Sequence, residues 1–142
     1  MTFANKMPTP TAYIYFGIQG DFDPHEFADR IQLSPDKCVA KHVSNPEHNI
    51  PRTSLLRYAQ VETFLDLIDI YELAERSFDI LEPHLDSFAS TIRDYDAEAV
   101  FQVVLYFPAS EDISTPAFGF SKRVVSFIAS AGASVDIDTY RS

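Results

Sequence analysis

The chain has few of the residues on which several classes of protein depend. Its 142 residues include a single cysteine, Cys38, so no disulfide can form within the chain. A lone cysteine fits a reducing compartment. No apolar stretch is long enough for a signal peptide or for a membrane span. We therefore expect a soluble cytoplasmic protein.

Basic residues are also scarce. The chain has 11 Lys and Arg and 21 Asp and Glu, which gives a net charge of −10. A protein that binds nucleic acid or an anionic membrane needs a basic stripe, and the sequence has none. We therefore expect neither kind of partner. The negative charge is concentrated in residues 62–98, where eleven acids against two bases give −9.

Motifs for phosphate binding, zinc binding and nucleophilic catalysis are missing as well. The four glycines form no phosphate loop, the serines have no nucleophile-elbow context, and the four histidines have no zinc-site spacing. Cys38 precedes His42 by four residues, so a Cys-His nucleophile pair is conceivable. The favoured interpretation is a small, buried strand residue.

One group of carboxylates invites a metal hypothesis. If the first and last strands pair, four aspartates could meet at one edge and bind Mg²⁺ or Ca²⁺: Asp21, Asp23, Asp136 and Asp138. A structural explanation of these aspartates is stronger than the metal hypothesis. Asp23 suits a helix N-cap, and Asp136 and Asp138 alternate on the polar face of a strand. We expect no metal and no cofactor.

Apolar residues make up 46% of the chain, enough for one hydrophobic core. We predict a flexible arm over residues 1–11 and a single domain over residues 12–142. The alternation in residues 12–18 predicts a strand. A short helix should follow, with Asp23 as N-cap, Pro24 at the first position, and a hydrophobic staple between Phe22 and Phe27.

The middle of the chain shows helical periodicity. Apolar residues at spacings of three and four predict a helix that packs on a sheet: Phe64, Leu67, Tyr71, Ala74, Phe78, Leu81, Leu85, Phe88 and Ile92. Pro83 should kink or divide this helix. A coiled coil would show the same spacing, but the neighbouring strands already offer an apolar surface to cover.

The remaining segments complete an α+β pattern. Strands are predicted at residues 37–43, 55–63, 97–107, 117–120 and 135–140, with a loop at residues 44–53. Ser121 should cap a last helix that ends at Gly132, with Val124, Val125 and Ile128 turned inward. The order predicts a mostly antiparallel sheet with helices packed on it, a ferredoxin-like β-α-β-β-α-β core extended by a C-terminal αβ element.

Three short segments carry a resemblance to a known family. They are Gly-Asp-Phe-Asp-Pro at 20–24, Phe-Gly-Phe-Ser at 118–121 and Gly-Ala-Ser-Val-Asp-Ile-Asp-Thr-Tyr at 132–140. Together they resemble a bacterial family known only as domain of unknown function 4279. The resemblance spans nearly the whole chain and implies a small bacterial cytoplasmic domain without catalytic residues. Families of this sort include small acidic antidotes encoded beside secreted toxins.

The acidic helix surface is the least ordinary feature of the sequence. We predict a non-catalytic protein-binding domain, in particular an immunity-type inhibitor of a basic toxin, with a partner site at Asp69, Glu72, Asp79 and Asp86. A solvated surface that only aids solubility would have the same composition. The alternatives are a small-molecule binder or enzyme with a pocket between the sheet and the 44–53 loop, and a homo-oligomeric domain without chemistry.

Overall fold

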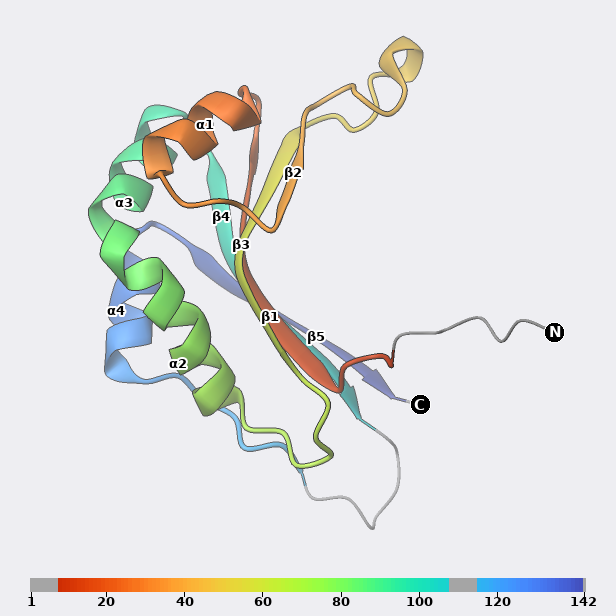
Figure 1. Ribbon diagram of the computed structural model, residues 1–142, viewed down its shortest axis with the longest axis vertical. Helices are drawn as coiled ribbons and strands as arrows, with labels where there is room; N and C mark the ends of the chain where they lie inside the picture. Colours follow the sequence, from red (N-terminus) through yellow and green to blue (C-terminus); the bar gives the residue numbers. More distant parts are fainter. Residues whose placement is uncertain (1–7, 108–114, 142) are drawn as a thin grey trace, which may run out of the picture.

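The computed structural model describes residues 8–107 and 115–141, which form one five-stranded sheet with helices packed against it (Figure 1). The strands lie in the order β2-β3-β1-β4-β5. All neighbours are antiparallel except β4 and β5, which are parallel. The bounds are β1 Ala12–Gly20, β2 Lys37–Val39, β3 Ser54–Thr63, β4 Glu98–Phe107 and β5 Ser134–Arg141.

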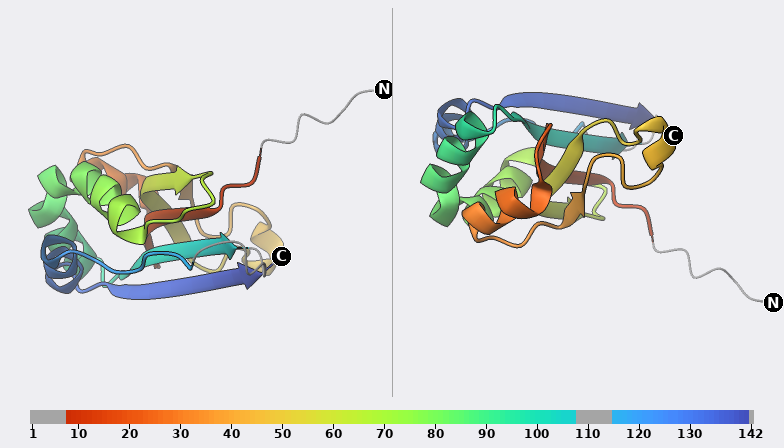
Figure 2. Two further views of the ribbon diagram at one scale, coloured as in Figure 1. Left: turned by 90° about the horizontal axis from the view of Figure 1, so that it is seen from below. Right: turned by 90° about the horizontal axis from the view of Figure 1, so that it is seen from above.

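Four α-helices connect these strands: α1 Pro24–Ile31, α2 Ile70–Leu81, α3 Leu85–Asp94 and α4 Lys122–Ser130. Short 3-10 turns occur at η1 Pro46–His48 and η2 Glu82–His84. These four α-helices all lie on one side of the sheet, and no helix of the described residues lies on the other face (Figures 1 and 2). Among the described residues, no helix has both the length and the apolar content needed to cross a membrane.

The predicted fold class is confirmed. The order β2-β3-β1-β4 with connectivity β-α-β-β-α-β is the ferredoxin-like arrangement, and α4 then carries the chain to β5 beside β4. A parallel neighbour needs such a crossover connection, which explains why a helix precedes β5. The long apolar run of β4 fits its position, because strands cover both of its edges.

The alternation predicted for the first strand decides which side of the sheet is the core. Ile14, Phe16 and Ile18 are fully buried beneath the helices, whereas Tyr13 and Tyr15 lie half-buried on the other face. Aromatic rings fill the space between sheet and helices. The Phe16 ring meets those of Phe88 and Phe127 edge-on, with centroids 5.2 and 5.1 Å away.

The start of α1 has the predicted cap and staple. Asp23 accepts a hydrogen bond from the backbone N–H of His25 at 2.9 Å, and Pro24 occupies the first turn. The rings of Phe22 and Phe27 pack with centroids 5.1 Å apart. The turn after β1 therefore begins a helix, which gives the Gly-Asp-Phe-Asp-Pro sequence a structural explanation.

The prediction for the long middle helix was wrong at its beginning. Helix α2 starts only at Ile70, and Asp69 caps it by accepting from the N–H of Glu72 at 3.2 Å. Phe64 and Leu67 precede the helix and are 49% and 69% exposed. The reason is tertiary: residues 68–70 pair with Ala117, whose backbone accepts from Ile70 N–H and donates to Ile68.

Beyond that start, the prediction of a helix divided at Pro83 is confirmed. Pro83 lies in η2, which separates α2 from α3, and both helices pack on the same side of the sheet. Phe88 and Ile92 continue the buried stripe on α3. Tyr71, by contrast, turns outward and is half exposed, because the buried face of α2 begins one residue earlier at Ile70.

Smaller differences concern segment lengths. The strand predicted at residues 37–43 spans only Lys37–Val39, and that at residues 117–120 is reduced to one bridge at Ala117. On α4, Val125 is half exposed and Phe127 takes the inward position, since Phe127 lies three residues after the buried Val124. Residues 1–7 of the predicted 1–11 arm lie outside the described residues, and Thr11 is fixed by hydrogen bonds to Thr63 and Leu65.

Candidate functional site

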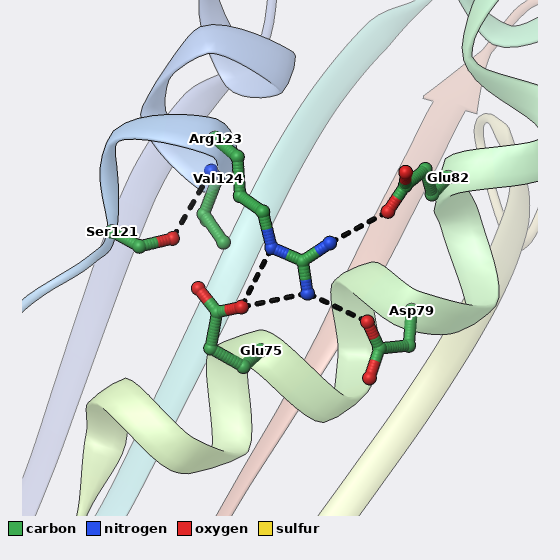
Figure 3. Close-up of polar contacts among 6 residues, drawn as sticks. All are labelled: Glu75, Asp79, Glu82, Ser121, Arg123 and Val124. Atoms are coloured by element: carbon green, nitrogen blue, oxygen red, sulfur yellow. Dashed lines mark hydrogen bonds and ion pairs between the residues drawn. The ribbon is translucent and has the colours of Figure 1, made fainter.

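A cluster of one arginine and three carboxylates joins α4 to α2 (Figure 3). Glu75, Asp79 and Glu82 project from one face of α2 and its C-terminal end, because they are spaced four and three residues apart. The guanidinium of Arg123 donates to all three at 2.6–2.7 Å. It also lies 4.7 Å from the centroid of the Phe78 ring.

The electrostatics of the cluster are those of an excess of carboxylate around one cation. Asp79 and Glu75 raise the pKa of Arg123, so it stays charged at every pH of interest. The Ser121 hydroxyl and the Arg123 guanidinium lower the pKa of Glu75. Three carboxylates against one guanidinium leave a net charge of −2 on this surface.

The pH dependence of stability should reveal this coupling. The pKa of folded Glu75 lies below its ordinary 4.5, so its ionised form stabilises the fold above pH 4.5, and this contribution is lost as the pH falls through the lowered pKa. Arg123→Gln should remove the part of that contribution that the guanidinium supplies and leave the part due to the Ser121 hydroxyl. The free energies of unfolding of wild type and variant, measured by urea melts, should differ most near neutral pH and converge as the pH falls through the lowered pKa of Glu75.

A matched control is Arg76→Gln, because Arg76 makes only a 3.6 Å, exposed pair with Glu72 within α2. Its effect on the free energy of unfolding should be smaller than that of Arg123→Gln. A difference between wild type and Arg123→Gln that does not change with pH would contradict the electrostatic explanation and assign the effect to packing on Phe78.

Beside this cluster, a cleft of about 620 Å³ lies between the α2–α3 pair and α4. Phe78, Leu85 and Phe127 contribute apolar surface to it, whereas Asp86 and Lys122 are charged groups at its border. Glu82 and Arg123 belong to both the cluster and the cleft. The cleft thus combines an apolar lining with two carboxylates, of which Glu82 is held by Arg123.

A family model described as "Domain of unknown function (DUF4279)" matches residues 10–142. The chain belongs to this family. The match covers nearly all of the chain, including the whole sheet and every helix described above. No curated protein and no solved structure matches the chain. DUF4279 membership assigns no role to a residue, so any function must be argued from the site itself.

The four acids predicted to form a partner site in this DUF4279 domain are all exposed, but they have different local roles. Asp69 caps α2, Glu72 pairs with Arg76, and Asp79 binds Arg123. Asp86 lies in the first turn of α3 at the cleft and makes no ion pair with another described residue. Glu75 and Glu82 belong to the same surface and were missed.

Arg123 was missed for a simple reason. It lies outside the acidic segment in the sequence, so a charge count over residues 62–98 finds only two bases near eleven acids. The spacing of Glu75, Asp79 and Glu82 was the available signal, because it places three carboxylates on one helix face where a cation from another element can be held.

The four aspartates of the metal hypothesis do not gather. Asp21 pairs with Lys41, Asp23 caps α1, and Asp138 accepts from the side-chain amide of Gln102 at 3.3 Å. The contact to Lys41 lowers the pKa of Asp21. Within residues 8–107 and 115–141, no three His, Cys, Asp or Glu side chains are placed to hold a metal ion together.

The other two sequence hypotheses concern Cys38 and the 44–53 loop. The Cys38 sulfur lies 4.0 Å from Nδ1 of His25, so the histidine contact it makes is to α1 rather than to His42. Burial, with the charge of Asp23, raises the pKa of the thiol, which disfavours the reactive thiolate.

A second cleft, of about 720 Å³, lies on the uncovered sheet face around Gly17, and no residue of the 44–53 loop lines it.

Proposed function

We propose that this domain is a non-catalytic protein-binding domain whose partner is basic. The observation that carries the proposal is the Arg123 cluster, which has a net charge of −2 and borders an apolar cleft through Glu82 and Arg123. An immunity-type inhibitor of a basic toxin is the specific form of this function that we favour, since a small acidic domain suits the neutralisation of a basic surface.

Charge supports this choice of partner. Residues 70–94 carry six carboxylates and two arginines. Arg123 from α4 and Arg30 from α1 also pair with this segment, so six acids against four arginines still leave −2. A basic partner would neutralise this surplus, and the attraction would speed association at low ionic strength.

The cleft supports a protein as the partner. Interfaces between proteins combine an apolar centre with a polar rim, which is the arrangement of the half-buried Leu85 and Ala89 beside Glu82 and Asp86. A lysine or arginine side chain has an apolar stem and a charged end. Such a side chain would place its stem against Leu85 and Ala89 and its charge beside Asp86.

The test compares three baits immobilised on beads: wild type, Glu72→Lys with Asp86→Lys, and Asp29→Lys with Glu47→Lys. Both double variants change the net charge equally, but Asp29 and Glu47 lie on α1 and η1, away from the cleft. The first variant leaves the Arg123 cluster intact. Proteins retained from an extract of the source cells are identified by mass spectrometry, and binding is then measured with each purified protein.

We expect a basic protein that wild type and the α1–η1 variant retain and that the Glu72→Lys, Asp86→Lys variant binds about ten-fold more weakly or worse, mainly through slower association at low salt. If all three baits behave alike, or if both double variants lose the protein equally, the helix surface is not a specific site and the acids serve solubility alone.

A second candidate function is small-molecule binding on the uncovered sheet face. The observation in its favour is the cleft of about 720 Å³ around Gly17, bordered by Tyr15, Gln102 and Asp136. At Gly17 an added Cβ would come within 3.1 Å of the Tyr15 ring, so glycine keeps the floor of this cleft open.

A further inference from the structure

Strand β5 is an edge of the sheet that is open to another strand. Its hydrogen-bonding neighbour is β4, in an unbroken parallel register from Val100 opposite Ser134 to Phe107 opposite Arg141. The strand has eight residues, all of them exposed, and it runs along the outside of the molecule (Figure 2). The backbone groups on its outer side face no other strand of the described chain. Such an edge is a template for one more strand.

The two edges of this sheet differ sharply. The other edge, β2, has only three residues, begins with Lys37 and follows Pro35, and short length, lysine and proline all discourage strand addition. Strand β5 has none of these devices: no proline, no lysine and no bulge interrupt it. The open edge is therefore particular to β5 and is not a general property of the sheet.

Side chains on β5 alternate in chemistry as well as in direction. Asp136 and Asp138 lie opposite Gln102 and Val104 on the uncovered face of the sheet. Val135 and Ile137 point to the helix side but remain 39% and 42% exposed, because none of the described helices reaches over this edge. The strand thus presents two carboxylates on one face and two apolar groups on the other.

This pattern argues against a second copy of the chain as the neighbour. In a two-fold antiparallel pair centred on Ile137, Asp136 of each copy would face Asp138 of the other. Pairs centred on Asp136 or Asp138 would place like residues opposite themselves. Like charges directly opposite each other destabilise a strand pair, so the registers with the largest overlap are disfavoured.

We propose that the β5 edge binds an extended segment of a partner protein that has basic residues at alternate positions, opposite Asp136 and Asp138, with an apolar residue between them. The added strand would supply backbone hydrogen bonds to β5 and would cover Ile137. Opposite charges across a strand pair are stabilising, which selects the basic residues. This surface is separate from the α2–α4 cleft, and the inference stands without the function proposed above.

The probe is a peptide as long as β5, capped at both ends, in which lysine and valine alternate. Its control has the same composition arranged in two blocks. In a third peptide, glutamate and valine alternate. A fourth peptide has the lysine–valine sequence with N-methyl groups on alternate residues, which removes the backbone N–H donors from one edge of the peptide strand. Binding is measured by fluorescence anisotropy, and hydrogen exchange follows the amides of β5.

The alternating lysine peptide should bind about ten-fold more tightly than the block peptide and should slow exchange in β5, and N-methylation on the pairing edge should abolish both effects. The variant Asp136→Lys with Asp138→Lys should no longer bind the alternating lysine peptide and should bind the alternating glutamate peptide instead. Asp29→Lys with Glu47→Lys, of equal charge change, should bind as wild type does. Thermal melts establish that each variant is folded.

Three results would overturn the proposal: equal affinity for the alternating and block peptides, equal weakening by the two charge-reversal variants, or a dimer in sedimentation that the lysine peptide dissociates. The last would identify a second copy as the occupant. Glu72→Lys with Asp86→Lys should leave peptide binding unchanged, so failure at this edge is distinguishable from failure at the helix cleft.

Discussion

Replacing Phe88 with alanine should lower the free energy of unfolding by about 3–5 kcal/mol, the largest effect that we expect of any substitution discussed. The Phe88 ring is fully buried and connects α3 to three other elements. Its centroid lies 5.2 Å from that of Phe16 on β1, 5.0 Å from Tyr58 on β3 and 6.4 Å from Phe127 on α4. Removing the ring leaves a cavity that rigid neighbours on both layers cannot fill. Urea denaturation at neutral pH measures the loss.

The matched control is Phe64→Ala. Both phenylalanines belong to the same periodic stripe in the sequence, but Phe64 precedes α2 and is about half exposed. Its replacement should change the free energy of unfolding by no more than about 0.5 kcal/mol. Similar losses for the two variants would contradict the structure and restore the longer helix that periodicity alone predicts.

These two residues show what the sequence could determine and what it could not. Alternation placed Phe16 toward the core, and the cap and staple signals placed the start of α1 at Asp23, because those features depend on neighbouring residues. Periodicity could not locate the start of α2. That start depends on Ala117, a residue far along the chain whose backbone pairs with residues 68–70. Local signals do not contain such a contact.

The candidate site was only partly predictable for the same reason. Helical spacing indicates that Asp79 and Asp86 project away from the sheet, and both are exposed. The partner that organises Asp79 is Arg123, which comes from a different helix 44 residues later. Likewise, the sequence suggested His42 for Cys38, whereas the packing of α1 against the sheet supplies His25. Contacts between distant elements decided both cases.

Tyr58 presents a polar group in an unfavourable place. Its side chain is fully buried on the helix side of β3, and its hydroxyl has no hydrogen-bond partner among the described residues. Burial, with the neighbouring Cys38, raises the pKa of this phenol well above its ordinary value. An unpaired buried hydroxyl destabilises a fold, because the group loses its hydrogen bonds to water without replacing them.

Tyr58→Phe should therefore raise the free energy of unfolding by about 1–2 kcal/mol, because it removes the unpaired oxygen and keeps the ring that packs on Phe88. The control is Tyr140→Phe, because the Tyr140 ring is half exposed on β5. Urea melts should show little change in its free energy of unfolding, so the difference between the two variants isolates the effect of burial. A loss of stability in Tyr58→Phe would mean that the hydroxyl has a partner in solution. That result would contradict the unpaired state of the hydroxyl. A gain in stability would show that the buried hydroxyl destabilises the fold, as its unpaired state predicts.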